Sequence, residues 1–142
     1  MIFIDANIFL EVMLEQKKAN ECKKLLNYLE KSSKCAWINI FNVFSIILII
    51  QHHSGNIEKS KEVLKSLASY NGLQVYYPNL RVIIEALDLQ REHSLDFDDG
   101  LVLASMNDLK VKKIVTFDKH FSAIKFIDIF SPSNALNYLL GK

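Results

Sequence analysis

The sequence predicts a three-layer α/β/α fold: a single domain over residues 1–142 with a central five-stranded parallel sheet. Short apolar runs alternate along the chain with longer segments whose apolar residues recur at helical spacing, which is typical of parallel strands joined by crossover helices. The length suits one hydrophobic core. The 4 glycines and 2 prolines leave little room for a linker between domains.

The five strands follow from the apolar runs. We expect them at Ile2–Ile4, Lys34–Ile38, Leu73–Tyr76, Lys113–Thr116 and Lys125–Ile129. Helical spacing predicts helices at Lys17–Ser32, Ile57–Tyr70, Asn79–Glu92 and Leu101–Leu109, and a helix-like stretch follows Asp5. Turns at Ser54-Gly55-Asn56 and Asn71-Gly72 separate elements, and Ser131-Pro132 opens a last helix, Pro132–Leu140.

The segment Ile40–Gln51 is ambiguous on propensity. Its β-branched residues favour a strand, but its length favours a buried helix, which we predict. The surrounding apolar run, Trp37–Ile50, is shorter than the roughly 18 residues that a membrane-spanning helix needs and is interrupted by polar residues.

Charge and cysteine content narrow the class of protein. The net charge of +1 argues against a strongly basic nucleic-acid coat, although local patches can still contact phosphates. No signal-peptide pattern is visible, and Cys22 and Cys35 lack the spacing of a metal-ligand pair. We therefore expect a cytoplasmic protein with two reduced thiols.

Aspartates stand where predicted strands end and helices begin. Asp5 follows Ile2–Ile4, Asp118 follows Lys113–Thr116 after one residue, and Asp99 precedes an apolar helical pattern. Because the carboxyl ends of parallel strands share one edge of a sheet, these side chains can converge although they are far apart in the chain.

Each aspartate taken alone is more often a helix N-cap than a catalytic residue. Convergence changes that balance, because three carboxylates about 5 Å apart would repel by roughly 3 kcal/mol per pair at an effective dielectric constant of 20. A fold tolerates such repulsion when a cation or protons offset it. Carboxylate oxygens suit Mg²⁺ or Mn²⁺ rather than zinc.

Three segments resemble the PIN domain family of ribonucleases and VapC-type toxins. They are the N-terminal IFIDANIFL, the stretch DFDDGLVLASMNDLKVKKIVTFDKHF, and the ending FSPSNALNYLL. Asp99, followed by a small residue and an apolar helix, resembles the third acidic position of the family, and Thr116–Phe121 resembles the segment around the fourth.

The resemblance implies metal-dependent endoribonuclease activity on RNA, with Mg²⁺ or Mn²⁺ as cofactor. Asp5, Asp99 and Asp118 would hold the metal and act in catalysis, while Asn7, Asp98 and Thr116 would orient ligands or water. Capping is an equal alternative for Asn7. The resemblance also implies a homodimer and, for a toxin of a toxin–antitoxin pair, an antitoxin protein as partner.

The sequence departs from the family at one acidic position. The family usually carries a glutamate on the helix after the second strand, but no acidic residue lies between Lys31 and Ile57, and Ser45 or an apolar neighbour takes that place. Glu11 is a weak substitute because helix geometry points it away from Asp5. An RNA- or protein-binding PIN-like module without catalysis is therefore the alternative.

Other polar residues give weaker signals. Lysines at 110, 112, 113, 119 and 125 form a candidate phosphate-binding rim, with Lys112, Lys113 and Lys119 the main candidates, although a solvated face is the more common role of such lysines. His93 and His120 could contact phosphate, but we expect them to cap helices or lie on the surface. Tyr76 and Tyr77 could stack bases, but we expect one of them to enter the core. A flavodoxin-like phosphoacceptor would need an aspartate at Tyr76-Tyr77-Pro78.

Overall fold

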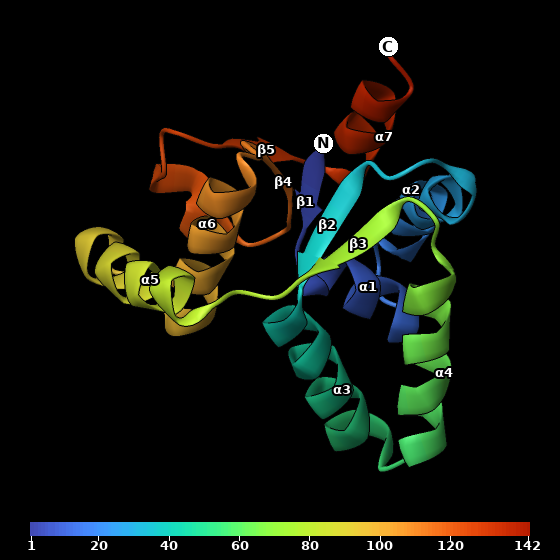
Figure 1. The fold of residues 1–142 in the computed structure, drawn as a ribbon. Helices are drawn as coiled ribbons and strands as arrows, with labels where there is room; N and C mark the ends of the chain where they lie inside the picture. Colours follow the sequence, from blue (N-terminus) through green and yellow to red (C-terminus); the bar gives the residue numbers. More distant parts are fainter.

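A computed structural model describes residues 1–142 (Figure 1). In chain order the elements are β1 (Ile2–Ile4), α1 (Ala6–Met13), α2 (Ala19–Lys31), β2 (Ala36–Asn39), α3 (Ile40–Ser54), α4 (Ile57–Ser69), β3 (Leu73–Tyr76), α5 (Leu80–His93), α6 (Phe97–Leu109), β4 (Lys113–Val115), the 3₁₀ helix η1 (Lys119–Ala123), β5 (Asp128–Phe130) and α7 (Pro132–Leu139).

The sheet has five strands in the order β3-β2-β1-β4-β5, and every neighbouring pair is parallel. This confirms the predicted five-stranded parallel sheet. A flavodoxin-like sheet has the order 2-1-3-4-5, so the topology excludes that alternative. The strand that ends at Tyr76 lies at the edge of the sheet, and the central strand, β1, is the one followed by Asp5.

Helices cover both faces of the sheet. Side chains alternate along β1, so Ile2 and Ile4 join one buried cluster while Phe3 joins the other. The first cluster packs under α1, α2, α4 and α7, and the second packs under α5 and α6 (Figure 1). The predicted three-layer α/β/α architecture is therefore confirmed.

The ambiguous segment after β2 is the helix α3, as predicted from its length. Asn39 has extended backbone angles, and its side-chain oxygen accepts a hydrogen bond from the Asn42 amide at 2.8 Å. This N-cap, together with burial of Ile46 and Ile50, overrides the strand propensity of the β-branched residues. None of the helices in the structure has the length and apolar character needed to span a bilayer.

Several element boundaries differ from the sequence prediction, among them the start of β2 at Ala36 rather than Lys34, and the two largest shifts are at α6 and β5. The helix α6 begins at Phe97 rather than near Leu101, because the extended backbone of Asp96 forms its N-cap, and Asp99 therefore lies inside the first turn. The strand β5 begins at Asp128 rather than Lys125, because residues 125–127 turn the chain from η1 back to the sheet.

Close packing of α5 against α6 fixes the position of that first turn. A Cβ atom on Gly100 would lie 2.6 Å from the carbonyl oxygen of Ala86 in α5, which is closer than real Cβ contacts allow. Only glycine therefore permits this approach of the two backbones. The residue before it, Asp99, is held against the edge of the sheet as a result.

Candidate functional site

Thr116 connects the ends of β1 and β4 at the carboxyl edge of the sheet. Its hydroxyl donates a hydrogen bond to Asp5 Oδ2 at 2.7 Å and accepts one from the Asp118 backbone N–H at 2.9 Å. The Asn7 side-chain amide also donates to the Thr116 oxygen at 3.2 Å. This buried hydroxyl thus fixes the orientation of Asp5 relative to the start of η1.

Asp5 and Asp118 both cap helices and face the same edge of the sheet. Asp5 Oδ1 accepts from the Ala6 backbone N–H at 2.8 Å, and Asp118 Oδ1 accepts from the His120 backbone N–H at 2.8 Å. Both residues are therefore helix N-caps, as the sequence suggested. Each can still bind a metal, because only one of its two carboxylate oxygens makes the capping hydrogen bond.

His120 brings Asp99 and Asp118 together. Its Nδ1 atom lies 3.3 Å from Asp99 Oδ2 and 3.2 Å from Asp118 Oδ1. Asp99 is 6% exposed, whereas His120 lies on the surface. A single imidazole nitrogen thus bridges a buried carboxylate of α6 and the carboxylate that follows β4.

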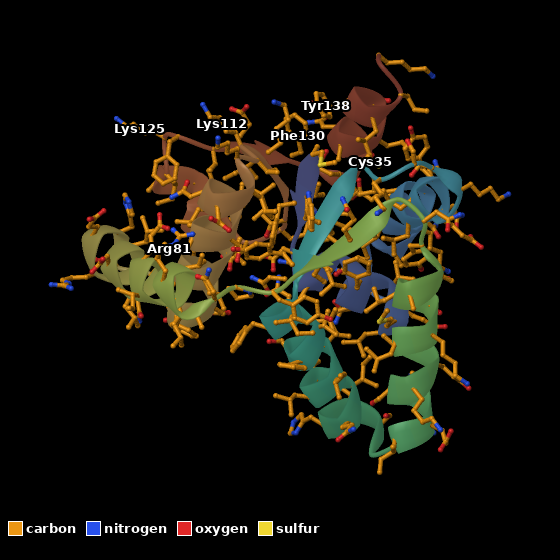
Figure 2. All side chains as sticks on the ribbon, viewed as in Figure 1. Cys35, Arg81, Lys112, Lys125, Phe130 and Tyr138 are labelled. Carbon is orange, nitrogen blue, oxygen red and sulfur yellow. The ribbon has the colours of Figure 1, made fainter.

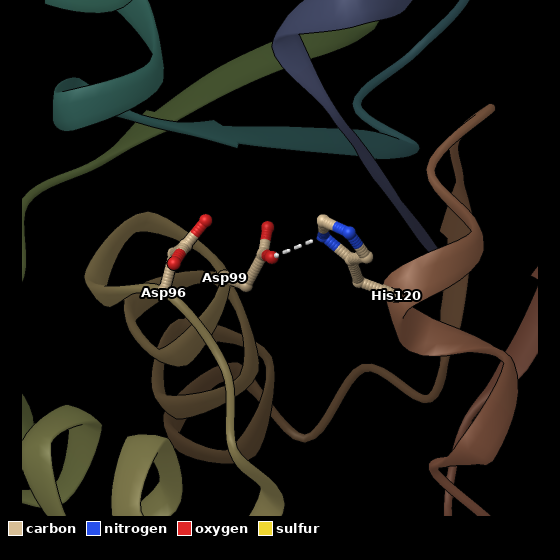
Figure 3. A group of neighbouring side chains, drawn as sticks. All are labelled: Asp96, Asp99 and His120. Atoms are coloured by element: carbon tan, nitrogen blue, oxygen red, sulfur yellow. Dashed lines mark hydrogen bonds and ion pairs between the residues drawn. The ribbon is translucent and has the colours of Figure 1, made fainter.

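The tightest cluster of metal-ligating atoms differs from the predicted trio. One ligand atom each from Asp96, Asp99 and His120 lies within 4.8 Å of the others, and Figure 3 shows these side chains facing one another. Asp5 and Asp118 are not members of this cluster. They join it through Thr116 and His120, so the carboxylates form one connected edge rather than a single three-residue clamp.

The carboxylates carry more negative charge than the surrounding protein compensates. Burial raises the pKa of Asp5 to about 6, and the hydrogen bond from Thr116 offsets only part of that effect. Burial, and then the negative charge of Asp98, raises the pKa of Asp99 to about 6. The charge of Asp118 raises the pKa of His120 above its ordinary value. Such an arrangement favours uptake of protons or of a cation.

Comparison with known families identifies the family to which the chain belongs. The sequence model of the PIN domain matches residues 2–127. The chain belongs to the PIN domain family.

Individual relatives are distant in sequence. The chain is 24% identical to ribonuclease VapC2 of Methanocaldococcus jannaschii, over 90% of this chain and 91% of the relative. It superposes on Mycobacterium tuberculosis VapC20, a sarcin–ricin loop cleaving toxin, with a TM-score of 0.75 and 15% identity, covering 90% and 98% of the two chains. A chain of a toxin–antitoxin complex from Klebsiella pneumoniae gives a TM-score of 0.69 and 14% identity, covering 93% and 98%.

Asn42, rather than Ser45, is the α3 side chain that contacts Asp5. Its Nδ2 donates to Asp5 Oδ1 at 3.4 Å from the first turn of α3, whereas Ser45 makes no hydrogen bond with these carboxylates. The prediction from the sequence named Ser45 or an apolar neighbour and missed Asn42, because the residue pattern does not show which α3 side chain reaches Asp5. Glu11 caps a different segment, since its Oε1 accepts from the Lys18 backbone N–H at 2.9 Å.

The predicted lysine rim does not form a single patch. Lys119 follows Asp118 directly and is exposed at the carboxyl edge. Lys113 lies at the opposite edge, where Asp128 is 3.9 Å away and the Tyr138 ring lies beneath its ammonium group. Lys112 is exposed near Lys113. Of the three main candidates, only Lys119 is therefore close to the carboxylates.

Of the remaining predicted residues, Asp98 lies beside the carboxylates and the two tyrosines do not. Asp98 is exposed in the first turn of α6, where its charge acts on Asp99. The Tyr76 hydroxyl donates to Asp108, away from the carboxylates, and Tyr77 is exposed.

The donor set fits a divalent cation. Asp96 and Asp99 offer oxygen atoms and His120 offers a nitrogen within one cluster, with Asp5 and Asp118 beside it. Hard oxygen ligands suit Mg²⁺ and Mn²⁺, and an imidazole nitrogen is accepted more readily by Mn²⁺ than by Mg²⁺.

Proposed function

We propose that this PIN domain is a Mg²⁺- or Mn²⁺-dependent endoribonuclease and the toxin of a toxin–antitoxin pair. The observation that carries the proposal is the buried Asp99 carboxylate, held beside Asp96 and His120 at the edge of the sheet where Asp5 and Asp118 also lie. The names of its relatives, ribonuclease VapC2 and the sarcin–ricin loop cleaving toxin VapC20, support the same activity.

The roles of the residues follow from their contacts. Asp5, Asp99 and Asp118 would hold the ion, with Thr116 and Asn7 orienting Asp5 and Asp98 adding negative charge beside Asp99. A bound divalent ion lowers the pKa of a water molecule and offsets charge on the leaving oxygen.

One basic side chain is placed to contact the RNA. Lys119, exposed next to Asp118, is placed to bind a phosphate.

An RNA cleavage assay tests this activity. The purified protein should cut single-stranded RNA with Mn²⁺ and stop when a chelator is added. Asp99→Asn should lower the rate by about a hundred-fold or more, because it removes the central ligand of the site. Asp88→Asn is the matched control, since Asp88 is an exposed carboxylate paired only with Arg91. Equal rates for Asp99→Asn and the parent would remove Asp99 from the site.

A binding module without catalysis is the second candidate function. The absence of an acidic residue between Lys31 and Ile57 favours it, because α3 offers Asp5 only the neutral amide of Asn42. One ligand fewer weakens metal binding, although Mg²⁺ commonly keeps several waters and few protein ligands. Cleavage by the pure protein that a chelator abolishes would eliminate this candidate.

An antitoxin is the proposed protein partner. A hollow of about 310 Å³ between α3 and α4 is lined by ten residues, all hydrophobic, including Phe44, Ile47 and Leu64. Apolar grooves of this kind accept the apolar face of a helix. Phe44→Glu should therefore abolish co-purification of the partner while RNA cleavage persists.

A homodimer is proposed from an apolar stripe on α5. Leu80, Ile84 and Leu87 are exposed at helical spacing. Light scattering should give a mass of twice 16.3 kDa, the mass of one chain, for the parent protein. The Ile84→Glu variant should give the monomer mass of 16.3 kDa. A mass near 16.3 kDa for the parent at micromolar concentration would contradict the dimer.

A further inference from the structure

A second hollow lies at the end of α6 that is opposite to the carboxylates. It has a volume of about 560 Å³ and lies between the C-terminal ends of α5 and α6 and the turn before β5. Its floor is apolar and buried, formed by Leu89, Met106, Val111 and Ile127.

One wall of this distal hollow is aromatic. The rings of His93 and Phe126 lie with their centroids 5.8 Å apart and their planes inclined at 57°. Phe126 is 43% exposed although it is fully apolar. An exposed aromatic face beside an apolar floor can stack a nucleobase, because every base has a π-face.

The rim of the distal hollow is cationic. Lys110 and Lys112 line it, and neither makes an ion pair within the chain. Lys125 precedes Phe126, and Figure 2 shows Lys112 and Lys125 extending from the same side of the molecule. Glu92 is the one carboxylate in the lining, and it lies 3.9 Å from His93. The excess of positive charge suits a phosphate group.

The backbone of Lys110 points to a role for its side chain. Lys110 has a φ of 57°, in the left-handed region, where it ends α6. Glycine is the usual residue in such a cap because it adopts this conformation without strain. A strained non-glycine residue on the rim of a hollow favours a function for the side chain.

The distal hollow is continuous with the carboxylate edge. A smaller hollow of about 380 Å³ is lined by His93, Ser94, Leu95, Asp96 and His120. His93 lines both hollows, while Asp96 and His120 belong to the acidic cluster. The two hollows therefore adjoin at His93, whose ring centroid lies 5.8 Å from that of Phe126, so a strand bound at the carboxylates can pass over Ser94 to Phe126.

We propose that the distal hollow binds a nucleotide of single-stranded RNA beyond the carboxylates, with the base against Phe126 and a neighbouring phosphate between Lys110 and Lys112. The proposal rests on the proposed function in taking RNA as the ligand, but it does not require cleavage. Such a site would add a base contact and a phosphate contact to those that the carboxylates make with the RNA.

Fluorescence anisotropy of the full-length protein with labelled single-stranded RNA tests it. A chelator is present throughout, so that no strand is cut. Phe126→Leu keeps the apolar volume and removes the aromatic face, and it should weaken binding at least about five-fold, the lower end of the loss for one stacked base. Tyr138→Leu, which removes an exposed ring on α7, is the matched control.

The lysine variant separates binding from folding. Lys110→Gly should weaken binding and reduce the slope of log affinity against log salt by about 0.7, the contribution of one phosphate contact on a single strand. Because glycine suits the left-handed cap, the melting temperature should stay equal or rise. Lys65→Ala removes an exposed lysine of α4 and should leave affinity and slope unchanged.

The outcomes distinguish this proposal from the nuclease proposal. Parental affinity and salt slope in both Phe126→Leu and Lys110→Gly would overturn the distal site, even if the protein cleaves RNA with Mn²⁺. A parent that binds no RNA would overturn it too. Binding that depends on Phe126 in a protein that never cleaves RNA would support the distal site and reject the nuclease.

Discussion

The side-chain amide of Asn42 donates a hydrogen bond to Asp5 Oδ1 across 3.4 Å, from the first turn of α3 to the end of the central strand. Asn42 is 4% exposed, so the contact lies inside the edge of the sheet. A neutral donor here reduces the charge of the acidic edge. A carboxylate at this position would add a further oxygen ligand beside Asp5.

Asn42→Glu should strengthen Mn²⁺ binding by about ten-fold, because ligand charge tunes the affinity of oxygen sites. Without metal, it should lower the free energy of unfolding by about 1–3 kcal/mol, since it adds a charge among buried carboxylates. Isothermal calorimetry and urea unfolding measure the two effects. Asn42→Gln is the neutral control of equal size. If Asn42→Gln binds Mn²⁺ as tightly as Asn42→Glu, charge at this position has no role.

Thr116→Val should loosen the acidic edge without adding volume. It removes the hydroxyl that donates to Asp5 and accepts from Asn7 and the Asp118 backbone N–H. We expect a loss of about 1–2 kcal/mol in the free energy of unfolding and a ten-fold or larger loss in Mn²⁺ affinity, roughly the effect of removing a group that orients a ligand. Thr116→Ser, which keeps the hydroxyl, should restore most of both.

The metal-free protein should lose stability as the pH rises from about 5 to about 7. The folded-state pKa values of Asp5 and Asp99 are about 6, above the unfolded value of 3.8, so the folded state binds more protons in this window. The raised pKa of His120 acts in the same direction, because its contribution is present at low pH and is lost on deprotonation.

Urea unfolding should show a fall of about 2–4 kcal/mol over that window. Mn²⁺ should raise the melting temperature more at about pH 7 than at about pH 5, because protons compete with the ion. In Asp99→Asn, both the free energy of unfolding and the effect of Mn²⁺ on the melting temperature should depend less on pH. A parent whose stability rises over the window would contradict the assignment of raised pKa values.

Gly100→Ala should displace the first turn of α6. The added Cβ would lie 2.6 Å from the Ala86 carbonyl oxygen, so α6 must move away from α5. We expect a loss of about 1–3 kcal/mol of stability and weaker Mn²⁺ binding, because Asp99 moves with the turn. Unchanged melting temperature and Mn²⁺ affinity would show that the contact does not position Asp99.

The sequence predicts strand ends well because a parallel sheet places them on one edge. Asp5 and Asp118 could be located on this basis, and Thr116 lies between them in space as its place after β4 suggests. Helix packing is not encoded in the same way. The inclusion of Asp96 and His120 in the acidic cluster depends on where α6 and η1 begin.

The lysines show a second limit of sequence reasoning. Lys113 and Lys119 are six positions apart, yet the strand β4 separates them, so they lie at opposite edges of the sheet. Lys113 is held by Asp128 on the neighbouring strand. The sequence prediction grouped these lysines because they are close along the chain, but the length of β4 places them at different edges of the sheet.

Calorimetric titration of Mn²⁺ into the purified protein, beside Asp5→Asn and Asp99→Asn, tests the central proposal most directly. We predict one bound ion in the parent and the loss of that binding in both variants, with Asp88→Asn behaving as the parent. Binding that survives in Asp5→Asn and Asp99→Asn, or no binding by the parent at millimolar ion with or without RNA, would contradict a metal site among these carboxylates.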